Sequence, residues 1–178
     1  KGRGAPAHFG VADRIEMVTS TLGKTLGGAT GGFTSGKAEV IELLRQRSRP
    51  YLFSNSLPPP IVAGAVCALD LVKQGDYIRE RLIDNAAYFR GELTALGFRL
   101  VPGEHPIIPV LLGDAALATS MAEALLTEGV YVVGFSYPVV PQGQARIRTQ
   151  MSAAHTRIQL QQAVAAFAKV GQALGVIA

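Results

Sequence analysis

The segment Thr21-Leu22-Gly23-Lys24-Thr25-Leu26-Gly27-Gly28-Ala29 places one lysine among small and hydroxyl-bearing residues. Schiff-base chemistry needs an amine that can lose its proton, and small neighbours allow a flat ring to lie close to the backbone. Hydroxyl groups and free backbone N–H groups beside such a lysine can bind a phosphate. Lys24 is therefore a candidate site for a covalently bound cofactor, and an exposed lysine in a glycine-rich loop is the alternative.

A second lysine follows the sequence Gly31-Gly32-Phe33-Thr34-Ser35-Gly36. This stretch, with Lys37, matches the first part of a phosphate-binding P-loop, but Ala38 stands where Ser or Thr normally holds magnesium. Partial matches of this kind arise easily in glycine-rich sequence. We therefore disfavour nucleoside triphosphate hydrolysis as the activity.

Arg146 and Arg148 lie in an alternating segment, residues 145–151, which predicts a β-strand with both arginines on one face. Two like charges on one strand face suit a nearby anion, and a guanidinium group can bind a carboxylate through two parallel hydrogen bonds. A solvent-exposed edge strand would explain the same spacing. The pattern alone leaves both interpretations open.

Composition excludes several other classes of function. The net charge is +4, but the basic residues are scattered and no aromatic residues interleave with them, so nucleic-acid binding is disfavoured. No apolar run approaches the roughly 20 residues that span a membrane. The three histidines are far apart, so we expect no metal site. The only cysteine, Cys67, lies in an apolar stretch where we expect a buried thiol, and a cytoplasmic location follows from this sparing use of cysteine.

Periodicity and turn residues predict an α/β chain in two parts, with a boundary near residue 75. Strands are expected at residues 16–20, 33–34, 51–53, 98–101, 107–112, 130–133 and 145–151. Helices are expected at residues 37–47, 61–73 and 77–95, after Asp114 to Glu128, and after Thr156 to about Leu174.

Three segments together resemble the α-oxoamine synthase family of fold-type-I pyridoxal-phosphate enzymes. They are the lysine segment at 21–28, LRQRSRPYLFSNSL at 44–57 and YPVVPQGQARIRTQMSAAHT at 137–156. The resemblance covers the whole chain. It implies that residues 1–75 form the end of a large, mostly parallel-sheet domain that binds the cofactor, and that residues 76–178 form a small C-terminal α+β domain.

The resemblance also implies a role for individual residues. Lys24 would carry pyridoxal 5'-phosphate as a Schiff base, and Thr21 would bind its phosphate. Ser54 and Asn55 would reach the phosphate of the partner subunit's cofactor, which implies a homodimer with shared active sites. Arg148 would bind the carboxylate of the amino-acid substrate.

The reaction implied is the condensation of glycine with acetyl-CoA to 2-amino-3-ketobutyrate and CoA, a step of threonine degradation. A sibling synthase of the 8-amino-7-oxononanoate or 5-aminolevulinate type, using another acyl-CoA, is the first alternative. A non-catalytic dimerising domain is the second. The family's Asp-x-x-His motif, which supplies groups to the cofactor ring, is absent from the 178 residues. We therefore expect a fragment of a longer protein that is inactive by itself.

Overall fold

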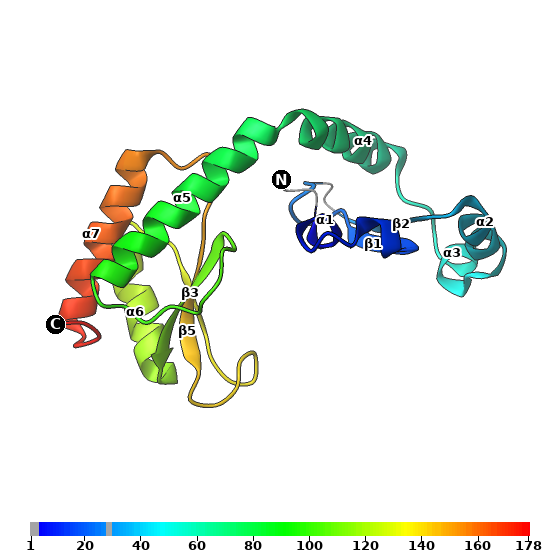
Figure 1. The fold of residues 1–178 in the computed structure, drawn as a ribbon. Coiled ribbons are helices and arrows are strands. Elements are labelled where there is room, and N and C mark those ends of the chain that lie inside the picture. Colours follow the sequence, from blue (N-terminus) through cyan, green and yellow to red (C-terminus); the bar gives the residue numbers. More distant parts are fainter. Residues whose placement is uncertain (1–3, 28–29) are drawn as a thin grey trace. The chain divides into compact units, whose positions relative to one another are not determined.

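The computed structural model describes residues 4–27 and 30–178 and divides into two compact units, one ending at Asp76 and the other spanning Tyr77–Ala178 (Figure 1). The first unit contains α1 (Ala5–His8), a 3-10 turn (Ala12–Arg14), β1 (Met17–Thr21), β2 (Gly32–Gly36), α2 (Ala38–Arg47), α3 (Arg49–Phe53) and α4 (Pro59–Gln74). The second contains α5 (Asp76–Ala95) except for its first residue, and also β3 (Ile107–Gly113), α6 (Ala115–Thr127), β4 (Val133–Phe135), β5 (Ala145–Gln150) and α7 (Arg157–Ala173).

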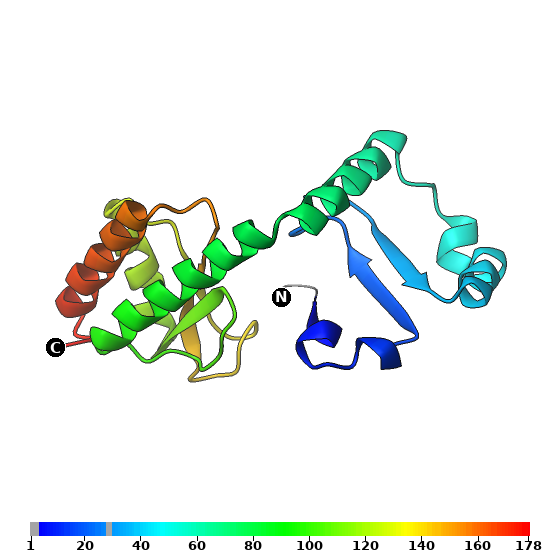
Figure 2. The same cartoon turned by 45° about the horizontal axis from the view of Figure 1, so that its top comes forward.

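An antiparallel pair of strands, β1 and β2, is the sheet of the first unit (Figure 2). Thr21 pairs with Gly32 and Met17 with Gly36. The two glycines are required by close packing, since a Cβ atom on Gly32 would lie 2.6 Å from the Ser20 carbonyl oxygen, and one on Gly36 would lie 2.8 Å from that of Glu16. The stretch that partly matches a P-loop is thus β2 itself, paired along its length rather than looped around a phosphate.

The prediction of a strand at 51–53 is wrong, because these residues end the short helix α3. Pro50 lies in the first turn of α3, where its missing N–H costs nothing. The backbone N–H groups of Tyr51 and Leu52 both donate to the Ser48 carbonyl, at 3.1 and 3.0 Å. The guanidinium of Arg49 lies 5.0 Å from the ring centre of Phe53 one turn later. Pro50 therefore ends α2 and begins α3.

Cys67 lies on α4 and is exposed, so the prediction of a buried thiol is wrong. Ala65 is the buried residue of this helix, whereas Val66 and Leu71 are more than half exposed. The helix has apolar residues on most of its circumference, and the described residues cover little of it. The sequence therefore predicts the helix around Cys67 correctly, but not the exposure of its thiol.

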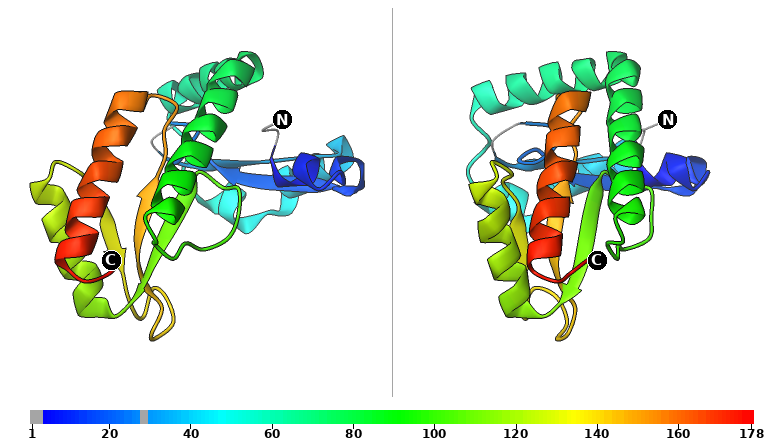
Figure 3. Two further views of the ribbon diagram at one scale, coloured as in Figure 1. Left: turned by 60° about the vertical axis from the view of Figure 1, so that its left-hand side comes forward. Right: turned by 90° about the vertical axis from the view of Figure 1, so that its left-hand side faces the viewer.

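A three-stranded antiparallel sheet, in the order β3-β5-β4, forms the second unit with α5, α6 and α7 (Figure 3). Alternate residues of β3 and β5 are buried, including Ile108, Val110 and Ile147. They pack in one core with residues from all three helices, among them Phe89 and Phe167. The three helices thus share one face of the sheet, and the side chains of the other face point away from this core.

Two further strand predictions need correction. Residues 98–101 contribute a single bridge, between Leu100 and Val110, rather than a strand. Residues 130–132 precede the strand that was predicted to include them, and β4 begins at Val133. The Val130 N–H donates to the Leu125 carbonyl at 2.8 Å, so this residue closes the end of α6 and is not available to a sheet.

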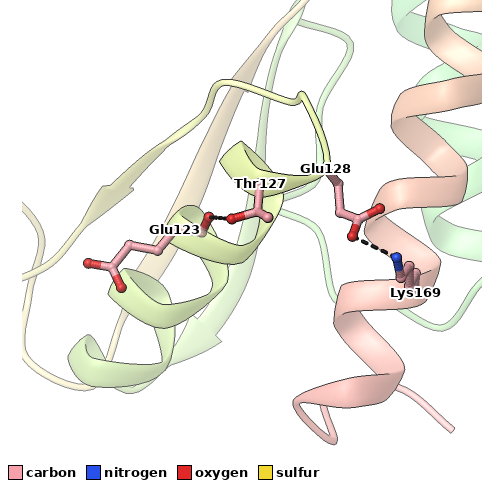
Figure 4. A network of polar contacts seen from close by, with 4 residues as sticks. All are labelled: Glu123, Thr127, Glu128 and Lys169. Atoms are coloured by element: carbon pink, nitrogen blue, oxygen red, sulfur yellow. Dashed lines mark hydrogen bonds and ion pairs between the residues drawn. The ribbon is translucent and has the colours of Figure 1, made fainter.

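Side-chain caps lie at the N-terminal starts of α6 and α7, as the sequence predicts. Asp114 accepts from the Leu117 N–H at 2.8 Å, and Thr156 forms a capping box with Gln159. An ion pair of 2.7 Å joins Glu128, after α6, to Lys169 on α7 (Figure 4). None of the helices in the described residues combines the length and apolar character that spanning a membrane requires.

Candidate functional site

Lys24 lies on a bend directly after β1, and its side chain is exposed. Leu22 is 4% exposed, and its N–H donates to the Gly31 carbonyl at 2.9 Å, which fixes the start of the bend. The Gly27 N–H donates to the Lys24 carbonyl at 2.9 Å and closes a turn. Strand β1 and the buried Leu22 therefore present Thr21 and Lys24 at the strand end. Gly28, part of the predicted motif, lies outside the described residues.

Gly31 closes the far side of this loop and has a backbone φ of +85°, which favours glycine. It also needs to be glycine for space, because a Cβ atom there would overlap the side chain of Leu57. Leu57 belongs to the connector between α3 and α4. Ser54 and Asn55 lie in the same connector, and both are exposed. Leu57 thus packs beside Gly31, two to three residues after the exposed Ser54 and Asn55 in the same connector.

Arg148 lies on β5 with Pro109 of β3 and Val133 of β4 as its direct partners. It is exposed, on the side of the sheet opposite to the buried Ile147 and Thr149. Within the part of the chain that the structure describes, its guanidinium forms no hydrogen bond or ion pair, and its Cζ lies 5.6 Å from the centre of the Phe135 ring. The N–H edge of Arg148 is therefore free to bind an anion.

Arg146 shares this face of β5 but has a different environment. Its Nε donates to the Gln144 carbonyl at 3.0 Å, and its Nη2 donates to the Gln144 side-chain oxygen at 3.1 Å. Part of its fork is therefore engaged locally, next to the turn that precedes β5. The spacing could not separate the two arginines, but in the described residues only Arg148 has all of its N–H donors free of hydrogen bonds.

Two residues that sequence reasoning missed hold the strand of Arg148 and the loop after it. The buried Thr149 hydroxyl donates to the Ile108 carbonyl at 2.7 Å and joins β5 to β3. The Asn85 side-chain amide, 6% exposed, donates to the carbonyls of Ser152 and His155, both at 3.0 Å. A polar residue on the apolar face of α5 is the signal that could have identified Asn85, because buried amides require partners.

The predicted site residues fall in both units. Thr21, Lys24, Ser54 and Asn55 belong to the first unit, and Arg148 belongs to the second. Two clefts, of about 800 Å³ beside β2, α2 and α3 and about 740 Å³ beside α7, are lined by other residues. Among the described residues, no group of three His, Cys, Asp or Glu side chains is arranged to hold a metal ion.

The sequence of this chain is similar to those of known enzymes over nearly its whole length. The chain is 56% identical to the 2-amino-3-ketobutyrate coenzyme A ligase of Escherichia coli K12, over 99% of this chain and 44% of that protein. It is 44% identical to the 8-amino-7-oxononanoate synthase of Symbiobacterium thermophilum, over 99% of this chain and 45% of that protein. It thus spans less than half the length of these curated relatives.

Solved structures show the same relationship. A serine palmitoyltransferase from S. paucimobilis, with a bound PLP-myriocin aldimine, superposes with a TM-score of 0.92 at 36% identity, over 99% of this chain and 44% of that one. The family model for aminotransferase class I and II matches residues 2–167. The chain therefore belongs to the aminotransferase class I and II family, and its structural neighbours are fold-type-I enzymes.

Proposed function

We propose that the protein containing this chain is a pyridoxal-phosphate-dependent acyltransferase, which condenses glycine with acetyl-CoA to give 2-amino-3-ketobutyrate and CoA. The observation that carries this proposal is the 56% identity to the E. coli ligase over almost the whole chain. The proposal extends to a role in threonine degradation and to a cytoplasmic location. The chain spans 44% of the length of that ligase, so the activity is proposed for a protein of the ligase's full length.

Thr21 at the end of β1 and Lys24 on the bend after it fit a cofactor that carries an aldehyde and a phosphate. Such a group needs an amine free to react with the aldehyde and a donor free to bind the phosphate. Within residues 4–27 and 30–178, neither the Lys24 amine nor the Thr21 hydroxyl makes a hydrogen bond or ion pair, and both side chains are exposed. The buried Leu22 fixes the backbone between them. We propose that Lys24 holds the cofactor covalently and that Thr21 binds its phosphate.

When bound, pyridoxal phosphate acts as an electron sink that makes an α-proton of glycine removable. Lys24 would hold the cofactor through Nζ, and the same amine, when it is not bonded to the cofactor, would be the base that takes this proton. Arg148 would hold the glycine carboxylate through two parallel N–H hydrogen bonds. This contact would fix which α-carbon–hydrogen bond of glycine faces the base. The α-carbon would then form its bond to the acetyl carbonyl carbon as the carbon–sulfur bond of acetyl-CoA breaks, and the proton held by Lys24 would pass to the CoA thiolate, which leaves as the thiol.

Ser54 and Asn55 are proposed to complete the site of a second subunit. Both are exposed, and they follow α3 in a connector that continues into the proline-rich start of α4. A hydroxyl and an amide at such a position can donate to a phosphate. The proposal is therefore a homodimer in which each connector reaches the phosphate of the partner subunit's cofactor.

The proposed activity is tested on the full-length protein loaded with pyridoxal phosphate, by measuring release of free CoA thiol. Glycine with acetyl-CoA should give the highest kcat/KM. A clear preference for a longer or a dicarboxylic acyl-CoA would instead support a sibling synthase, an alternative that the 8-amino-7-oxononanoate synthase relative favours. A protein that acquires no cofactor absorbance would be a non-catalytic domain.

A further inference from the structure

The guanidinium group of Arg148 lies against an aromatic ring on the neighbouring strand. Its Cζ atom is 5.6 Å from the centroid of the Phe135 ring. A cation within about 6 Å of a ring centroid is attracted by the negative face of the ring. Phe135 is half-buried in the short strand β4, whereas Arg148 is exposed. The ring is therefore the more firmly held member of the pair.

The register of the sheet explains why the ring serves Arg148. Phe135 stands directly opposite Arg146, so Arg148, two positions further along β5, is its diagonal neighbour. Diagonal pairs are within reach of aromatic and long side chains. Arg146 donates to Gln144 instead, which leaves the ring to Arg148. Val133, directly opposite Arg148, has no ring that could take this place.

Stacking and carboxylate binding use different parts of a guanidinium. A guanidinium can lay its flat face on an aromatic ring while its N–H edge binds a carboxylate, so one arginine can do both at once. A long arginine side chain otherwise loses rotamer freedom when it binds, and a side chain already held by a ring loses less. We propose that Phe135 is a positioning residue that holds Arg148 ready for the glycine carboxylate, an inference that rests on the proposed function.

The test is the dissociation constant of glycine, measured by calorimetry on the full-length protein loaded with pyridoxal phosphate. Phe135→Leu removes the π-face and keeps apolar bulk, and it should weaken glycine binding about 2- to 5-fold. Phe135→Tyr keeps the ring face and should bind glycine as the unmodified protein does. The affinity for pyridoxal phosphate and the KM for acetyl-CoA should stay unchanged in both variants. Val133→Ala is the matched control, because it trims the same strand without touching the ring.

A double-mutant cycle separates positioning from a general effect on the strand. In the Arg148→Ala background, Phe135→Leu should cause no further loss of glycine affinity, because the group that the ring holds is gone. An equal loss in both backgrounds would overturn the inference. If Phe135→Leu lowers the unfolding temperature strongly, Phe135→Met gives a second variant that keeps bulk without an aromatic face.

The outcomes also distinguish this inference from the proposed function. If Arg148→Ala leaves glycine affinity unchanged, the assignment of the carboxylate site to Arg148 fails, and the inference fails with it. If Arg148→Ala weakens glycine binding but Phe135→Leu does not, the proposed function stands and only the role of Phe135 is overturned. Loss in Phe135→Leu together with recovery in Phe135→Tyr supports the inference.

Discussion

Arg146 and Arg148 carry the same charge on the same face of β5, yet their contacts separate their roles. Gln144 engages two nitrogens of Arg146, whereas Arg148 has an aromatic ring against its guanidinium and free N–H groups. The spacing of the sequence predicts the shared face, because side chains alternate along a strand. The spacing cannot predict which guanidinium donates to Gln144, because the position of Gln144 depends on the turn before the strand.

Removal of the Arg148 guanidinium should therefore affect glycine use more than removal of that of Arg146. A bidentate arginine–carboxylate contact contributes about 2 kcal/mol or more. We expect Arg148→Ala to raise the KM for glycine about 30-fold and to change the KM for acetyl-CoA little. Arg148→Lys should not restore binding, because it keeps the charge and loses the fork.

Steady-state kinetics of the full-length protein decide between the two arginines, with Arg146→Ala as the matched variant on the same strand. Arg146→Ala should be the milder change, because its guanidinium is engaged by Gln144. If Arg146→Ala damages glycine use and Arg148→Ala does not, the carboxylate site belongs to the other arginine.

Lys24 is expected to be the residue that holds the cofactor. Borohydride reduction of the full-length protein loaded with pyridoxal phosphate should fix the label to the peptide that contains Lys24. Its exposed amine on the bend after β1 is the structural reason. Lys37 is the internal control, because it is an exposed lysine in the same unit at the start of α2. A label on Lys37 would contradict the assignment.

At the level of elements, the sequence predicts the longer helices and misses the short ones. Apolar periodicity and caps such as Asp114 and Thr156 place α2, α4, α5, α6 and α7 within a few residues. Helix α3 has five residues, too few for a periodic pattern, and its tyrosine and phenylalanine favour a strand when read alone. Strand β4 begins later than predicted because the residues after Gly129 first complete the end of α6.

Alanine substitution should change the free energy of unfolding in opposite directions at two helical glycines, because one is closely packed and the other faces open space. A Cβ atom at Gly171 would lie 2.5 Å from the ring of Phe98, which is only 4% exposed and cannot move away. Gly171→Ala should therefore destabilise the protein by about 1–3 kcal/mol. Gly91 in α5 has no atom within 4 Å of that position. Gly91→Ala should stabilise by up to about 1 kcal/mol, and chemical unfolding of both variants checks the two signs.

The capping box at the start of α7 gives a prediction of its own. The Thr156 hydroxyl accepts from the Gln159 N–H at 3.3 Å, and the Gln159 side chain accepts from the Thr156 N–H at 2.9 Å. Thr156→Ala should lower the free energy of unfolding by about 1 kcal/mol. Thr119→Ala, at an exposed position inside α6, is the control and should change it by less than half as much. Equal effects at both positions would rule out a capping role.

For the whole molecule, the described hydrophobic core lies almost entirely in the second unit. Leu22 and Ala65 are the buried hydrophobic residues of the first unit, whereas Tyr51 and Phe53 there are 64% and 73% exposed. A second subunit could cover such a surface, and so could the remainder of a protein as long as the E. coli ligase, of which this chain spans 44%. The sequence does not predict this exposure, because hydrophobic periodicity is the same for a core and an interface.

If residues are shared between subunits, a hybrid dimer of two impaired variants should regain activity. In the proposed dimer, each site combines Lys24 of one subunit with Ser54 and Asn55 of the other. A hybrid of a Lys24→Ala subunit and a Ser54→Ala/Asn55→Ala subunit then contains one site with both defects and one intact site. We expect the purified hybrid, isolated through two different affinity tags, to release CoA at about half the rate of the unmodified dimer. A hybrid no more active than the Ser54→Ala/Asn55→Ala homodimer would show that Ser54 and Asn55 act within their own subunit. A hybrid of Lys24→Ala with the unmodified subunit is the control, and it should also retain about half the activity in either arrangement.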